Sequence, residues 1–255
     1  MSPRGEGRKG RKRDRAPASS GSEDQAAEDA RESGWKENVR SLAAAVVIFI
    51  LLRLFVLDTF YITSGSMEES LLVGDFLVVN DAAIGTRIPF TSLRVPGYSG
   101  PKRGDILVFD PPHEEDMKLV KRLIGVPGDT LQMRDRVLYL NGQAQDEPYV
   151  KSTGLADASD PWMSWQASHL APGLDRAAYR PTRDNWGPII IPEDRYFMLG
   201  DNRDNSLDSR YWGLLEKWRL EGRVSFIYFS YNSQSYRPFP FLREIRWGRI
   251  FSRPR

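Results

Sequence analysis

The chain has 255 residues, with 36 lysines and arginines against 34 aspartates and glutamates, and a formal net charge of +2 at pH 7. That length suits one sizeable domain with appendages or two small domains. The near balance of charge gives no reason by itself to infer a nucleic-acid partner. The chain has no cysteine, which excludes a disulfide framework, a thiolate zinc site and a cysteine nucleophile.

The first segment, residues 1–37, is expected to be a disordered basic tail. Its first fifteen residues are crowded with arginine and lysine, and large apolar residues are almost absent from the whole segment. Such a segment cannot bury enough apolar surface to offset the entropy lost on ordering. A solvated linker is the first interpretation, and binding of nucleic acid or lipid by the basic cluster is the alternative.

An apolar stretch follows and predicts one transmembrane anchor at residues 38–62. The stretch is long enough to cross a bilayer core, which takes about 20 helical residues. Arg53 lies inside it, and an arginine near a helix end can reach the headgroups. A buried core helix or an interfacial helix is the alternative. Because Lys36 and Arg40 precede the stretch, the positive-inside rule predicts a cytoplasmic N-terminus, with the rest of the chain outside.

Beyond the anchor, short apolar runs alternate with turn signals. The runs are bounded by Asn-Gly and Gly-Asp pairs, which favour tight turns through positive φ and local side-chain hydrogen bonds. Many short strands with little helical pattern predict an all-β, mostly antiparallel core made of residues 63–142 and 195–255. The expected strands lie at 76–79, 106–109, 118–124, 137–140, 195–199 and 224–229.

Residues 143–194 differ from the segments on either side. They are rich in Pro, Asp, Trp, Ser and Ala, and their hydrophobic periodicity is poor. We expect an inserted subdomain or long loop between strands of the core, with Trp162, Trp165 and Trp186 packed in a small cluster. A surface that faces the substrate is the alternative.

Three segments carry side chains suited to catalysis. In Thr63–Met67, two serines flank a glycine, which lets the backbone approach a reacting carbonyl closely. Lys121 lies in a strand-like apolar run, and residues 200–210 are dense with charge. Taken singly, these features are more typical of a turn serine, an exposed strand lysine and a solvated loop or ion-pair cluster than of an active site.

A serine hydroxyl needs a base to become a strong nucleophile. The chain has only two histidines and lacks the Gly-x-Ser-x-Gly and His-Glu-x-x-His patterns. A lysine can act as that base if it is neutral, and burial among apolar neighbours lowers a lysine pKa by up to about 3–5 units. The apolar residues around Lys121 make it the candidate.

In this order, the three segments resemble the signature motifs of type I signal peptidases. The resemblance covers the chain from the anchor to near the C-terminus, apart from the tail and most of 143–194. It rests on Ser-Gly-Ser-Met at 64–67, Val-Lys-Arg-Leu-Ile-Gly-Val-Pro-Gly-Asp at 120–129 and Gly-Asp-Asn-Arg-Asp-Asn-Ser-Leu-Asp-Ser-Arg-Tyr-Trp-Gly at 200–213. It implies a membrane-bound serine endopeptidase that removes signal peptides after small residues, at sites like Ala-x-Ala.

The resemblance also implies a role for each matching residue. Ser66 would be the nucleophile and neutral Lys121 the general base. Ser64 would help bind the oxyanion, and Ser206 would orient Lys121. Asp208 and Arg210 would form a supporting ion pair, and further support and pocket-wall roles would fall to Asp201, Asn205, Ile62, Met67, Leu119 and Val120.

The same resemblance implies no metal and no cofactor. It implies signal peptides and the lipid bilayer as partners, leaves room for a secretion translocon, and places the core outside the bacterial inner membrane. Two positions depart from the family pattern: Thr63 replaces a usual proline, and Glu69-Ser70 replaces a usual Pro-Thr. A self-cleaving repressor, a peptidase dedicated to one secretion or conjugation system and an inactive membrane scaffold are the alternatives.

Overall fold

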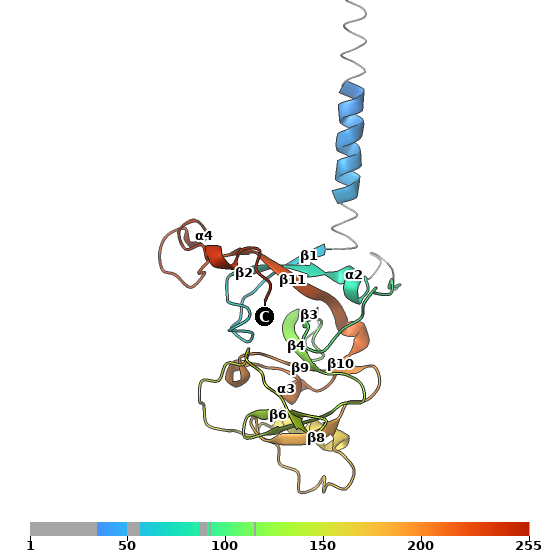
Figure 1. The fold of residues 1–255 in the computed structure, drawn as a ribbon, viewed down its shortest axis with the longest axis vertical. Coiled ribbons are helices and arrows are strands. Elements are labelled where there is room, and N and C mark those ends of the chain that lie inside the picture. Colours follow the sequence, from blue (N-terminus) through green and yellow to red (C-terminus); the bar gives the residue numbers. More distant parts are fainter. Residues whose placement is uncertain (1–34, 50–56, 87–90, 92, 115, 255) are drawn as a thin grey trace, which may run out of the picture. The chain divides into compact units, whose positions relative to one another are not determined.

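The computed structural model describes residues 35–49, 57–86, 91, 93–114 and 116–254 (Figure 1). Most of the expected tail and the middle of the expected anchor, residues 1–34 and 50–56, lie outside these ranges. Residues 35–49 form a helix with exposed side chains. Within the described ranges, no helix has both the length and the hydropathy needed to span a bilayer.

The core of the remaining unit is a seven-stranded sheet in which every neighbouring pair of strands is antiparallel. All six expected strands are present, five in this sheet and one (137–140) in a second sheet, so the prediction of a mainly antiparallel β fold is confirmed. In spatial order, the sheet consists of β1 (Leu57–Tyr61), β2 (Asp75–Asn80), β11 (Leu220–Ser230), β3 (Ile106–Phe109), β4 (Leu119–Gly125), β9 (Arg195–Leu199) and β10 (Leu215–Glu216).

Strand β11 joins two hairpins that are far apart in the sequence. One of its edges pairs with β2, from Arg223 opposite Asn80 to Ser230 opposite Asp75. Its first residues pair with β3. The long β11 therefore connects the β1–β2 hairpin with the β3–β4 hairpin (Figure 1).

Strand β1 occupies residues that the sequence analysis assigned to the end of the anchor. It pairs along its whole length with β2, from Leu57 opposite Asn80 to Tyr61 opposite Phe76. The apolar and aromatic residues that extended the hydropathy signal to Ile62 also have high strand propensity, and the partner strand decides between the two states. Ile62 then packs in the core instead of completing a helix.

A second antiparallel sheet of four strands lies beside the first, with β6 and β8 visible in Figure 1. It crosses the boundary that we drew at residue 143, because β8 comes from the expected insertion and pairs with β5 of the expected core. Pro188 obscured β8 in the sequence; as an edge strand, β8 tolerates a proline. In spatial order, this sheet consists of β7 (Gln143–Ala144), β6 (Val137–Leu140), β5 (Thr130–Arg134) and β8 (Trp186–Ile190).

The expected tryptophan cluster forms only in part. Trp186 is buried in the core of the second sheet and Trp165 packs against that core, whereas Trp162 is 55% exposed. Short helical segments lie between the strands or after β11: α2 (Asp81–Ile84), η1 (Pro161–His169), η2 (Arg203–Asn205), α3 (Ser209–Trp212), η3 (Lys217–Arg219), α4 (Pro240–Arg243) and η4 (Trp247–Arg249).

Candidate active site

The structure brings Ser66 and Lys121 into direct contact. Ser66 lies in the turn that follows β1, and Lys121 lies in β4. Lys121 Nζ is 2.6 Å from Ser66 Oγ and hydrogen-bonds to it, and it also donates to Val120 O at 3.2 Å. A hydroxyl held this close to an amine can lose its proton to that amine as it attacks a carbonyl carbon.

Burial makes Lys121 a suitable base. Its side chain is 2% exposed. Burial lowers the pKa of the amine from its ordinary value of 10.5 to about 8, although the negative charges of Asp208 and Asp201 act in the opposite direction. A substantial fraction of Lys121 is therefore neutral near pH 8, without help from a histidine.

Two donors near the nucleophile could bind an oxyanion. Ser64 is exposed, and its Oγ lies 3.4 Å from Ser66 Oγ. In the described part of the chain, the backbone N–H of Ser66 makes no hydrogen bond. Both groups are therefore available to a carbonyl oxygen that gains negative charge when Ser66 attacks.

Ser206 lies close to the pair but makes no hydrogen bond to Lys121 among the described residues, so its role in orienting that lysine stays a prediction. Its Oγ is buried, and interaction with Ser206 is one of the causes that lower the pKa of Asp208. It packs against Gly200, where an added Cβ would lie 2.1 Å from Ser206 Oγ and 2.6 Å from Ser66 O. Only glycine fits between these two residues, so the absence of a side chain at position 200 lets the last motif approach the nucleophile.

The supporting ion pair expected from the resemblance is present and fully buried. Arg210 Nε donates to Asp208 Oδ1 and Arg210 Nη2 to Asp208 Oδ2, both at 2.9 Å. Burial alone would raise the pKa of the Asp208 carboxyl, but the positive charge and hydrogen bonds of Arg210 hold that pKa below its ordinary value. Asp208 Oδ2 also accepts from Gly200 N, which ties the pair to the glycine behind the nucleophile.

Asp201 also belongs to a buried pair, with an arginine to which we had given no role. Arg122 donates to both Asp201 oxygens, at 2.8 and 2.7 Å, and to Ser70 Oγ at 2.9 Å. The guanidinium group of Arg122 also lies 3.8 Å from the centre of the Tyr149 ring. Arg122 follows Lys121 in the sequence, so its position in the motif was a signal, but its partners are too distant in the sequence to be foreseen.

A cleft of about 400 Å³ opens in front of Ser66. Its walls include the four residues expected to line a substrate pocket, and Asn205 also lines it. Pairing of β4 with β9 begins only at Arg122, so β9 does not cover the part of β4 that faces the cleft. The expected wall residues are Ile62, Met67, Leu119 and Val120.

One departure from the family pattern has a conformational consequence. Glu69, at one of the positions where the family usually has Pro-Thr, has φ of 95°. Proline is restricted to φ near −65°, so it cannot adopt the backbone conformation of residue 69. The turn behind the nucleophile therefore differs in shape from one that a proline could occupy.

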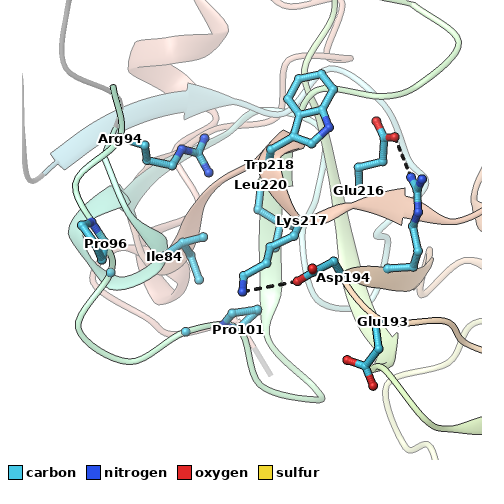
Figure 2. Close-up of a pocket in the computed structure, with 13 residues that line it drawn as sticks. Ile84, Arg94, Pro96, Pro101, Glu193, Asp194, Glu216, Lys217, Trp218 and Leu220 are labelled. Atoms are coloured by element: carbon cyan, nitrogen blue, oxygen red, sulfur yellow. Dashed lines mark ion pairs between the residues drawn. The ribbon is translucent and has the colours of Figure 1, made fainter. Parts of the chain in front are cut away.

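A larger cavity, of about 770 Å³, lies elsewhere on the same unit and shares no lining residue with the cleft. Figure 2 shows Trp218 above it and an ion pair between Lys217 and Asp194, 3.5 Å apart, across it. Its described lining residues include no serine or threonine. This cavity therefore lacks the hydroxyl nucleophile that the cleft contains.

Comparison with known proteins identifies the family. A family model described as "Signal peptidase, peptidase S26" matches residues 35–229. Signal peptidase I of Pseudomonas aeruginosa is 39% identical over 178 residues, which cover 68% of this chain and 61% of that protein. Signal peptidase I of Bacillus licheniformis is 34% identical over 197 residues, covering 77% and 89%.

A solved structure of a signal peptidase I from Enterococcus faecalis V583 has 30% identity and a TM-score of 0.34, covering 50% of this chain and 98% of that one. The matched part of this chain spans 61% of the length of its two Pseudomonas relatives. The family model matches well over half of the chain and includes both Ser66 and Lys121. The chain belongs to the signal peptidase family, peptidase S26.

Proposed function

We propose that this chain is a serine endopeptidase that cleaves signal peptides from exported preproteins. The observation that carries the proposal is the buried 2.6 Å contact between Lys121 Nζ and Ser66 Oγ at the floor of a cleft with apolar walls. Family membership and the names of the relatives support the same activity. An extended peptide with small side chains fits such a cleft, because its backbone can lie close to Ser66.

In the proposed reaction, neutral Lys121 accepts the Ser66 proton as Oγ attacks the carbonyl carbon of the scissile bond. The resulting oxyanion accepts hydrogen bonds from the Ser66 N–H and the Ser64 hydroxyl. The protonated Lys121 then donates its proton to the leaving amine, and the signal peptide stays attached to Ser66 as an ester. Lys121 next takes a proton from the water molecule that attacks the ester, and it returns this proton to Ser66 Oγ as the signal peptide is released.

We also propose that the apolar stretch after Lys36 and Arg40 anchors the chain in the bacterial inner membrane. The stretch from residue 38 to the start of β1 at Leu57 is about as long as a bilayer core requires. The basic residues before it favour a cytoplasmic N-terminus and a catalytic unit on the outer side. An enzyme on that side would meet signal peptides as exported chains emerge.

A cleavage assay tests the proposed activity. Purified, detergent-solubilised protein should cut a preprotein that carries an Ala-x-Ala site, and mass spectrometry should place the new N-terminus directly after the second alanine. The Ser66→Ala variant and a preprotein with tryptophan in place of that alanine are the two controls, and both should stay uncut. A wild-type protein that leaves the preprotein intact would refute the proposal.

The pH dependence tests the role of Lys121. Because its pKa is about 8, the neutral form falls about tenfold per pH unit below that value. We expect kcat/KM to rise up to about pH 8 and then level off, with a loss of about 100-fold between pH 7 and pH 5. The measurement is kcat/KM on a peptide substrate across this range, and a profile that is flat from pH 7 to pH 5 would contradict a neutral lysine base.

A further inference from the structure

Asn202 contacts the backbone on both sides of the nucleophile. Its side-chain Nδ2 donates to Gly65 O at 3.1 Å, and its backbone N–H donates to Ser66 O at 3.1 Å. The residue is 2% exposed and lies in the last motif, between Asp201 and the turn η2. One residue therefore holds the two peptide groups that flank Ser66.

The side-chain contact determines the direction of the Ser66 N–H. Gly65 C=O and Ser66 N–H belong to one peptide group, and in a trans peptide they point in opposite directions. Asn202 does not line the cleft and holds the carbonyl toward itself, so the Ser66 N–H points in the direction opposite to Asn202. This N–H makes no hydrogen bond within the described residues, which leaves it available to an oxyanion.

Gly65 makes this peptide group easy to rotate. A glycine has no Cβ to restrict its backbone, so the plane between Gly65 and Ser66 can turn at little cost. Gly65 O also accepts a hydrogen bond from the N–H of Glu68, at 3.1 Å, within the same turn. Asn202 supplies the hydrogen bond that comes from outside this turn.

Asn202 is itself held firmly. Lys151 N donates to Asp201 O at 2.8 Å, and Arg203 N donates to Lys151 O at 3.0 Å. The residues on both sides of Asn202 are therefore hydrogen-bonded to the backbone of Lys151. Its Oδ1 is buried and accepts no hydrogen bond in the described part of the chain. A buried unsatisfied oxygen costs stability, which indicates a role for the amide other than stabilising the fold.

We propose that Asn202 is a positioning residue that orients the Gly65–Ser66 peptide group so that the Ser66 N–H can bind the oxyanion. This inference rests on the proposed peptidase function and assigns to Asn202 a part in it through the Gly65–Ser66 peptide group; Asn202 Nδ2 also donates to Glu68 Oε2 in the same turn, at the longer distance of 3.4 Å. Loss of the amide should leave substrate binding intact and weaken the transition state. The nucleophile and base should remain in contact, because neither of them touches Asn202 through its side chain.

The experiment compares wild type with Asn202→Ala and with Asn202→Asp, which keeps the side-chain shape but has no donor facing Gly65 O. We expect kcat to fall about 10- to 100-fold with KM unchanged. This is less than the loss on removing an oxyanion donor outright, about 10²–10³-fold, because Glu68 N still binds the carbonyl. The midpoint of the pH profile should stay at its wild-type position.

Two inhibitors separate positioning from general damage to the site. A peptide aldehyde ending in Ala-x-Ala adds to Ser66 Oγ and places its oxygen where the oxyanion forms, whereas the corresponding peptide amide binds only as a ground-state ligand. For both variants, the aldehyde Ki should rise by the same factor as kcat/KM falls, and the amide Ki should not change. Equal weakening of both inhibitors, or of neither, would overturn the proposal.

Asn141→Ala is the matched control, because this residue in the turn between β6 and β7 also uses its amide for two hydrogen bonds: Oδ1 accepts from Thr130 N and Nδ2 donates to Asp129. It should lower thermal stability without changing the ratio of the two Ki values. A wild-type protein that cleaves no preprotein refutes the proposed function. A wild-type protein that cleaves normally, with Asn202 variants that match it in kcat and aldehyde Ki, refutes this inference alone.

Discussion

Replacing Lys121 by methionine should abolish cleavage and stabilise the protein at the same time. Without the base, kcat should fall by about 10⁴-fold or more, since Ser66 keeps its proton. The stability gain follows from the low pKa of Lys121, about 8 when folded against an ordinary 10.5. At pH 7, this shift costs the folded state about 3 kcal/mol, which a methionine of similar length avoids.

The sign of the pH dependence follows from proton counts. Between pH 8 and pH 10.5 the unfolded chain binds more protons at Lys121 than the folded chain does, so the contribution of this residue to stability rises with pH. The free energy of unfolding of Lys121→Met, relative to wild type, should therefore be highest below pH 8 and shrink as the pH approaches 10.5. Urea denaturation at several pH values measures this difference.

Lys217→Met is the matched control for this experiment. Lys217 is a lysine with an exposed side chain beside the larger cavity, where it faces Asp194 (Figure 2). Its replacement should leave both cleavage and the pH dependence of stability close to wild type. A Lys121→Met variant that is less stable than wild type at pH 7, or that still cleaves the preprotein, would contradict the proposal that buried Lys121 acts as a neutral base.

Removing Arg210 alone should have the largest effect on stability. Arg210→Met leaves the carboxylate of Asp208 fully buried with no opposite charge, which typically costs about 3–5 kcal/mol. The carboxylate would also act without its counter-charge on Lys121, whose pKa Asp208 already pulls upward. Any folded Arg210→Met enzyme should therefore show its pH–rate midpoint displaced to higher pH.

A double substitution distinguishes this cause from simple loss of packing. Asp208→Asn combined with Arg210→Met removes both charges, and it should recover a large part of the lost stability because no unpaired charge remains buried. Denaturant midpoints of the wild type, both single variants and the double variant complete the cycle. If the double variant loses as much stability as the sum of the two single variants, the ion pair is not the source of the effect.

The contact between Ser66 and Lys121 could be predicted from the sequence, because each residue lies in a short motif and the motifs follow one another in the order typical of the family. Ser66 and Lys121 are 55 residues apart and each looked ordinary alone, yet their motifs together pointed to one site. The partners of Arg122 and Asn202 escaped prediction because hydrogen bonds to Asp201 and Gly65 join positions 79 and 137 residues apart, with no local pattern. Such contacts depend on the completed sheet.

Strand predictions succeeded where apolar runs were bounded by turn residues, as in β3 and β4. They failed where tertiary pairing overrode the local signal. The residues of β1 were assigned to the membrane anchor because they are apolar, and β8 was not predicted because it contains Pro188. In both cases the partner strand supplies hydrogen bonds that a single segment of sequence does not reveal.

The place of β11 in the sheet has a consequence for synthesis on the ribosome. The β1–β2 hairpin carries the nucleophile and the β3–β4 hairpin carries the base, and the strand that joins them is made only when the chain reaches residues 220–230. A nascent chain that already contains Ser66 and Lys121 has no strand to hold them together. We therefore expect the contact between Ser66 and Lys121 to form only after synthesis has passed β11, so that the proposed active site is completed late in translation.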